Sequence, residues 1–250
     1  MTRTLVVSAL SALAFLGVAS HAQAPRSGLP PAAPAVAAGT IAGTVRFEGT
    51  PPRPRPVRME ADPLCVPVGK GVVFETLLVG GGGGVQNVFV YVKSGLGNKT
   101  FPAPAKPVSI DQKGCRYTPH VFGVQVGQPL SIHNSDPAVH NVNAIAKANK
   151  GFNLIQPKGV PSATRTFEEP EIMVPIRCDV HPWMTAWAGV VSHPFFAVSG
   201  ADGRFTITGL PAGKYTVEAW HEELGTQTQE VVVDAKKGAA PAFVFKPKGK

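Results

Sequence analysis

Three side chains that bind metals lie within seven residues of one another, in the segment Cys178-Asp179-Val180-His181-Pro182-Trp183-Met184. This segment directly follows an apolar stretch, 171–178, that is predicted to be a strand. A soft thiolate, a thioether and an imidazole suit copper, because such a ligand set serves both Cu(I) and Cu(II). The blue-copper pattern needs two His, one Cys and a long axial Met. Cys178, His181 and Met184 supply three of these four ligands.

The second imidazole must come from another part of the chain. His140 lies in a loop after a predicted strand at 130–132, and His133 is its rival. His133 falls within the apolar alternation of that strand, which favours His140 as the ligand. A zinc site would need a second Cys or His pair, which the sequence does not provide at the usual spacing. The sequence therefore predicts one copper ion held by His140, Cys178, His181 and Met184.

The chain has three cysteines, an odd number that leaves one over after any disulfide is formed. Cys178 has the metal-binding neighbours and is the one left over. Cys65 and Cys115 have no such neighbours, so we expect them to form a disulfide in an oxidising compartment.

The first residues of the chain have the pattern of a signal peptide. Arg3 precedes an apolar run at 5–18, and small residues follow it, which predicts cleavage after Ala22. The run is too short for a membrane span, although an uncleaved anchor is the alternative reading. Residues 23–38 are rich in Ala and Pro, which predicts a linker. We expect a periplasmic or secreted protein with no membrane span after cleavage.

Composition and charge limit the possible fold class and the possible kinds of partner. Loss of Arg3 with the leader lowers the formal net charge from +8 to +7, which favours an acidic partner. The basic residues are scattered along the chain, which argues against nucleic acid as a partner. The chain holds 27 Gly and 25 Pro and has few long helical patterns, which predicts an all-β fold.

Apolar alternation predicts the individual strands. Strands are expected at 40–47, 72–78, 86–92, 121–126, 231–233 and 242–245, and the clearest hairpin at 204–219. The five glycines at 80–84 are expected to form a flexible loop. They do not form a phosphate-binding loop, because Lys and Ser/Thr do not follow them.

The segment Val126-Gly127-Gln128-Pro129-Leu130-Ser131-Ile132-His133-Asn134, leading to His140-Asn141, resembles the cupredoxin family, and plastocyanin and amicyanin in particular. The short Cys-x2-His-x2-Met loop is similar to that of amicyanin. The resemblance implies a Greek-key β-sandwich over 106–198 with copper at one end. It also implies that Asn141 ties the two ligand loops together. Asp179, beside the Cys ligand, stands where these relatives usually carry a small hydroxyl residue.

The same resemblance implies where a partner docks. In this family the second His ligand, here His181, lies at the surface within an apolar patch. The corresponding docking patch would consist of Pro137, Ala138, Pro182 and Trp183. The expected partner is a redox protein, such as a cytochrome or a dehydrogenase, with an acidic surface.

The two flanks resemble a different family. Gly39-Thr40-Ile41-Ala42-Gly43-Thr44-Val45 and the segment around Leu210-Pro211-Ala212-Gly213-Lys214-Tyr215 are similar to carboxypeptidase regulatory-like modules, which have a transthyretin-like, carbohydrate-binding-like fold. The resemblance implies that 39–105 and 199–250 form one β-sandwich, into which the copper domain is inserted. Such modules are usually non-catalytic.

These features together predict an electron carrier. Four protein ligands would leave no open copper position for a substrate, and no acidic residue is tied to a nucleophile, so we expect no enzyme activity. A copper-holding or delivery protein is one alternative. A non-catalytic surface module is the other.

Overall fold

The computed structural model describes residues 38–234 and 236–247. The predicted signal peptide at 1–22 and the predicted linker up to residue 37 lie outside the described residues. The described chain is all-β apart from the short helix α1 (Val66–Gly69) and the 3-10 turn η1 (Gly81–Gly83). None of its helices is long and apolar enough to cross a membrane.

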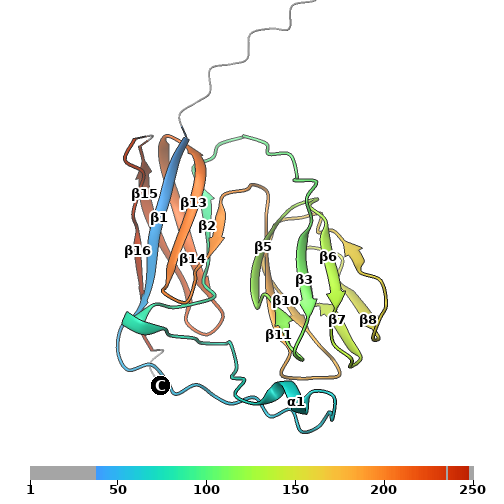
Figure 1. Ribbon diagram of the computed structural model, residues 1–250. Coiled ribbons are helices and arrows are strands. Elements are labelled where there is room, and N and C mark those ends of the chain that lie inside the picture. The colour runs from blue at the N-terminus through green and yellow to red at the C-terminus, as the bar shows by residue number, and fades with distance from the viewer. Residues whose placement is uncertain (1–37, 235, 248–250) are drawn as a thin grey trace, which may run out of the picture. The chain divides into compact units, whose positions relative to one another are not determined.

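The first β-sandwich is built from both ends of the described chain (Figure 1). In one sheet, β1 (Ala38–Phe47) lies between β13 (Arg204–Pro211) and β16 (Ala242–Phe245). The strand order of the other sheet is β12 (Phe196–Val198), β2 (Phe89–Ser94), β14 (Gly213–His221), β15 (Gly225–Val233). Inward side chains of both sheets form one core, which includes Ile41, Val45, Val90, Ile207, Val217 and Phe243.

The second β-sandwich is built from the middle of the chain. The order of its five-stranded sheet is β5 (Val121–Gln125), β11 (Thr185–Val191), β10 (Glu171–Arg177), β7 (His140–Ala144), β8 (Phe152–Gln156). The order of its four-stranded sheet is β4 (Tyr117–Thr118), β3 (Val108–Gln112), β6 (Leu130–Asn134), β9 (Ala163–Arg165). The chain crosses repeatedly between the two sheets, as in the Greek-key β-sandwich that the family resemblance implies.

Two glycines let strands of the two sandwiches approach each other closely. A Cβ on Gly123 would lie 2.2 Å from the ring of Phe196, and one on Gly189 would lie 2.4 Å from the ring of Phe89. No side chain larger than hydrogen fits at either position without a shift of these rings. The fully buried ring of Phe89 therefore packs directly on the backbone of β11.

The predicted hairpin at 204–219 is wrong. β13 pairs with β1, whereas β14 pairs with β2 and β15. The alternating apolar residues of β13 and β14 face the same core, but they do so from opposite sheets. The hairpin in this region joins β14 to β15, whose pairing ends at His221 and Gly225.

The predicted strand at 72–78 is wrong. This stretch forms no regular strand, and its Val73 makes only an isolated bridge to Pro56.

Two segments lie in a different sandwich from the one their sequence positions predict. Met59 and Cys65 pack into the core of the second sandwich, although they fall in the range 39–105 assigned to the first. β12 lies within the predicted range 106–198, but it pairs with β2 of the first sandwich.

Candidate metal centre

Two neighbouring strands bring the candidate ligands to the same end of a sheet. β7 and β10 are antiparallel, so the start of β7 lies beside the end of β10. His140 is the first residue of β7, and Cys178 directly follows β10. The loop 178–184 then connects β10 to β11. The rival ligand His133 lies on β6, where its Nε2 is 2.9 Å from Oγ of Ser131.

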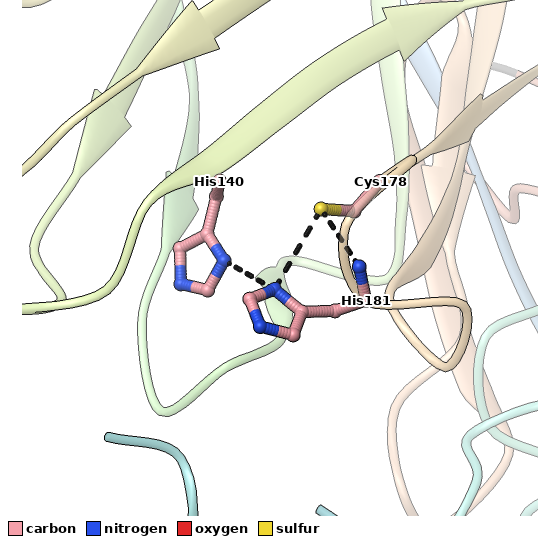
Figure 2. A group of neighbouring side chains, drawn as sticks. All are labelled: His140, Cys178 and His181. Carbon is pink, nitrogen blue, oxygen red and sulfur yellow. Dashed lines mark hydrogen bonds between the residues drawn. The ribbon is translucent and has the colours of Figure 1, made fainter. Parts of the chain in front are cut away.

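The side chains of His140, Cys178 and His181 point toward one another (Figure 2). The two Nδ1 atoms of His140 and His181 lie 2.9 Å apart, and Sγ of Cys178 lies 3.8 Å from Nδ1 of His181. The candidate ligand atoms of all three residues lie within 4.8 Å of one another. The three residues are at most 4% exposed. They form a buried cluster with the spacing of a metal site.

Two overlapping clusters among the described residues add carboxylates and the other cysteines. One contains Asp62, Cys65 and His181, and the other contains Cys115, Asp136 and His140. Cys65 and Cys115 form a disulfide, as the odd cysteine count predicts. Their sulfurs therefore offer no thiolate, and Cys178 is the free cysteine of the described chain.

Backbone hydrogen bonds close the ligand loop on itself. The N–H of Cys178 donates to the carbonyl oxygen of Met184 at 3.1 Å, and the N–H of Met184 donates to that of His181 at 2.9 Å. The N–H of His181 donates to Sγ of Cys178 at 3.4 Å. Met184 is 1% exposed and packs in the same core as Cys178. The loop thus holds its three candidate ligands in a compact turn.

Each of the two candidate histidine ligands has a carboxylate partner that the sequence analysis did not predict. Nε2 of His140 lies 3.0 Å from Oδ2 of Asp136, and Nε2 of His181 lies 2.8 Å from Oδ2 of Asp62. Asp136 also accepts hydrogen bonds from the backbone N–H groups of Gly114 and Cys115, both at 2.7 Å. A carboxylate on one ring nitrogen fixes the tautomer and leaves the other nitrogen to bind a metal.

Asn141 connects the two ligand segments. Its Oδ1 accepts from the backbone N–H of Asp179 at 2.7 Å and from Sγ of Cys178 at 3.3 Å. Its Nδ2 donates to Oδ2 of Asp179 at 2.8 Å. Nδ2 of Asn143 and Nδ2 of Asn153 also donate to the carboxylate of Asp179, and with Asn141 they lower its pKa. Asp179 therefore belongs to the hydrogen-bond network that surrounds Asn141.

The surroundings of Cys178 and His140 shift their pKa values in opposite directions. Burial raises the pKa of the Cys178 thiol, but hydrogen bonds from His140 and from backbone N–H groups outweigh it and lower the pKa to about 7. Burial lowers the pKa of His140, but Asp136 and Cys178 outweigh it and raise the pKa to about 9. Metal ions bind thiolate and neutral imidazole, so binding would release the His140 proton.

The expected docking patch is only partly at the surface. Pro137 and Pro182 are exposed and Trp183 is half-buried, but Ala138 is fully buried. His181 is 1% exposed, which contradicts the expectation that its ring edge reaches the surface. Asp62 and the Cys65 disulfide cover that edge, with Sγ of Cys65 3.8 Å from Nε2 of His181.

The half-buried Trp183 contacts the cluster through His181. The centroids of the Trp183 and His181 rings lie 5.0 Å apart. Nε1 of Trp183 donates to the carbonyl oxygen of Cys115 at 3.0 Å, which fixes the indole beside the disulfide.

No protein-family model matches the chain, and no curated protein matches it. Similar solved structures include a copper-containing nitrite reductase from Thermus scotoductus SA-01, at 21% identity and a TM-score of 0.31. That alignment covers 37% of this chain and 25% of the reductase, so the chain spans about a quarter of its length. An oxidised amicyanin mutant aligns at 20% identity and a TM-score of 0.31, covering 40% of this chain and 97% of amicyanin. A purple cupredoxin from Nitrosopumilus maritimus aligns at 23% identity and a TM-score of 0.28, covering 33% and 97%.

The donor chemistry of the cluster fits a copper ion. Two imidazole Nδ1 atoms and a sulfur with a lowered thiol pKa face one another. The outward Nε2 atoms are already engaged by Asp62 and Asp136, so only the Nδ1 atoms are left to coordinate. One thiolate with two imidazoles is the equatorial ligand set of a blue-copper site.

Proposed function

We propose that this protein is an exported type 1 copper protein that carries single electrons between redox partners. The observation that supports this most strongly is the buried convergence of His140, Cys178 and His181 on one point. Met184, in the same closed loop, is the proposed axial ligand. Copper bound there would supply a reversible change between Cu(I) and Cu(II).

The protein's own contribution is to hold the ligands still and to exclude water. The ring orientations of His140 and His181 are fixed by carboxylates on their Nε2 atoms. The thiol of Cys178 is fixed by Asn141 and by the N–H of His181. A ligand set that is rigid in this way undergoes little rearrangement when an electron is added or removed.

The proposed path for the electron runs through Trp183. Because His140 and His181 are both buried, neither ring edge can meet a partner directly. The half-buried Trp183 packs against His181, and the exposed Pro182 lies next to it. We propose that a redox protein such as a cytochrome or a dehydrogenase docks here, and that a net charge of +7 in the mature chain attracts an acidic surface.

Export is supported by the Cys65–Cys115 disulfide, because disulfides persist in oxidising compartments such as the periplasm. We propose no enzyme activity, since a copper ion with four protein ligands has no open position for a substrate.

A copper-holding or delivery protein is the alternative function. The burial of both histidines favours holding over delivery, because a buried ion is slow to leave. Reversible redox cycling with copper retained would indicate an electron carrier. Transfer of copper to an acceptor protein would indicate delivery.

The visible spectrum of the purified mature protein tests the proposal. A Cu(II)–thiolate bond gives intense charge-transfer absorption, so the copper form should be strongly coloured and should bleach on reduction. Cys178→Ser should abolish the band, and His140→Gln should weaken or shift it. His133→Gln is the matched control and should leave it unchanged. A wild-type protein that binds one copper per chain without this band would contradict the proposal.

A further inference from the structure

Asp62 comes from a segment that lies outside the strands of the sandwich holding the candidate ligands. It lies between β1 and β2 of the first sandwich in sequence, 119 positions before His181. Its Oδ2 nevertheless lies 2.8 Å from Nε2 of His181. Figure 1 shows this segment, around α1, as a long excursion away from β1 and β2.

Several contacts fix the position of Asp62. Its Oδ1 accepts from the N–H of Leu64 at 2.8 Å, and its carbonyl oxygen accepts from the N–H groups of Cys65 at 2.9 Å and Val66 at 3.2 Å. The side chain of Met59, three residues earlier, is buried in the core of the second sandwich. The Cys65–Cys115 disulfide then links the segment covalently to that sandwich.

The two histidines have matching environments. Asp136 binds Nε2 of His140, and Asp62 binds Nε2 of His181, so both Nδ1 atoms are directed inward. The two carboxylates are also connected through the disulfide. Asp136 accepts from the N–H of Cys115, and Cys65 lies three residues after Asp62. The disulfide thus joins the two elements that orient the two rings.

We propose that Asp62 is a positioning residue of the copper site: it accepts a hydrogen bond from Nε2–H of His181 and thereby holds Nδ1 of that ring toward Cys178. This inference rests on the proposed function. The segment carrying Asp62 then orients one ligand of the metal centre, although it lies outside the strands of the sandwich that holds the ligands.

The reason is the chemistry of a neutral imidazole. Only one ring nitrogen carries the proton, and a hydrogen bond to one nitrogen decides which nitrogen is free to bind a metal. Without Asp62, the proton can move to Nδ1 or the ring can turn, and either change opposes coordination. Removing such a partner of a ligating histidine typically costs about 10–100-fold in metal affinity.

The experiment measures Cu(II) affinity of the mature chain by competition with a chelator, for wild type and three variants. Asp62→Ala should bind copper about 10–100-fold more weakly. Asp62→Asn retains an acceptor oxygen and should recover part of the loss. Glu60→Ala is the matched control, because Glu60 is an exposed carboxylate two residues away, and its affinity should equal that of wild type. Equal affinity of Asp62→Ala and wild type would overturn the inference.

A second measurement separates this inference from the proposed function. Nitrogen-15 NMR of the metal-free protein reports which ring nitrogen of His181 carries the proton. We expect Nε2 in the wild type and a shift toward Nδ1 in Asp62→Ala. If the wild type binds no copper, the proposed function fails, and this tautomer shift alone decides whether Asp62 orients His181. An unchanged tautomer would refute the positioning role. If Asp62→Ala does not fold, Asp62→Leu is measured instead, because leucine is similar in size to aspartate and has no acceptor oxygen.

Discussion

Asn141 and Asp179 are joined by two hydrogen bonds. Oδ1 of Asn141 accepts from the backbone N–H of Asp179 at 2.7 Å, and its Nδ2 donates to Oδ2 of Asp179 at 2.8 Å. Asn141 directly follows His140, and Asp179 directly follows Cys178. This pair therefore couples the two segments that carry candidate ligands on neighbouring strands.

Asn141→Ala should destabilise the protein by about 1–3 kcal/mol, because it leaves buried polar groups without a partner. Asn141 is 2% exposed, so water cannot replace its amide. Urea unfolding of the metal-free protein measures the change. Asn143→Ala is the control, since Asn143 is partly exposed and its Nδ2 donates to the two oxygens of the same carboxylate at 3.1 and 3.4 Å, where water can replace it. Similar losses for the two variants would argue against a special role of Asn141.

Met184→Leu tests the axial ligand. The two side chains have similar volume, so the cost in stability should be less than about 1.5 kcal/mol. The Cu(II)–thiolate band should persist, because Cys178 is retained. The reduction potential should change, because the axial ligand tunes it in blue-copper sites. Voltammetry that finds the same potential for mutant and wild type would show that Met184 is only a core residue.

Trp183→Lys should slow electron exchange with the physiological partner while leaving the copper spectrum nearly unchanged. The indole contacts His181 and is partly accessible, so a charge there disturbs docking and spares the ligands. Stopped-flow kinetics measure the exchange, which should also fall with added salt. Val232→Lys, at a residue 68% exposed in the other sandwich, is the control. Equal rates for Trp183→Lys and wild type would place docking elsewhere.

The Cys65–Cys115 disulfide should contribute about 2–4 kcal/mol to stability, because it closes a loop with a sequence separation of 50 in the unfolded chain. The double variant Cys65→Ala/Cys115→Ala should lose that amount in denaturant unfolding. Peptide mapping without reductant should recover the two cysteines in one linked peptide pair. Recovery of Cys178 in a disulfide from the copper-bound protein would contradict both the pairing and the ligand assignment.

His120 should make stability depend on pH. Burial lowers its pKa, but the hydrogen bond and charge of Glu222, with smaller help from Glu75, outweigh burial and raise the pKa above 6.5. Its Nε2 lies 2.5 Å from Oε1 of Glu222. A raised pKa means that the contribution is complete below pH 6.5 and is lost as pH rises through the folded-state value.

The comparison variant for this pH dependence is Glu222→Gln. Unfolding free energies measured from pH 5.5 to pH 9 should fall less steeply in Glu222→Gln than in wild type. Glu223→Gln should behave as wild type, because the carboxylate of Glu223 forms an exposed ion pair with Arg55 at 3.7 Å, and such pairs contribute little to stability. Parallel curves for all three proteins would show that the His120–Glu222 pair does not set the pH dependence.

The sequence by itself determined the features that depend on residue type and local spacing. The segment 178–184 places Cys178, His181 and Met184 in one turn, and a single strand–loop–strand unit forms that turn. The odd cysteine count assigned the disulfide by elimination. Apolar alternation correctly identified the buried faces of β13 and β14, because that pattern reports which side of a strand leaves water.

Only the tertiary structure decided which segments meet. Alternation does not specify the partner of a strand, so β13 and β14 were expected to pair, whereas they lie in opposite sheets of one sandwich. Asp62 showed no sign of a role in the sequence, because 119 positions separate it from His181 and no local pattern links them. The contact exists because the disulfide and Met59 anchor its segment to the second sandwich. The same segment buries His181, which is why the surface position expected for that ring does not occur.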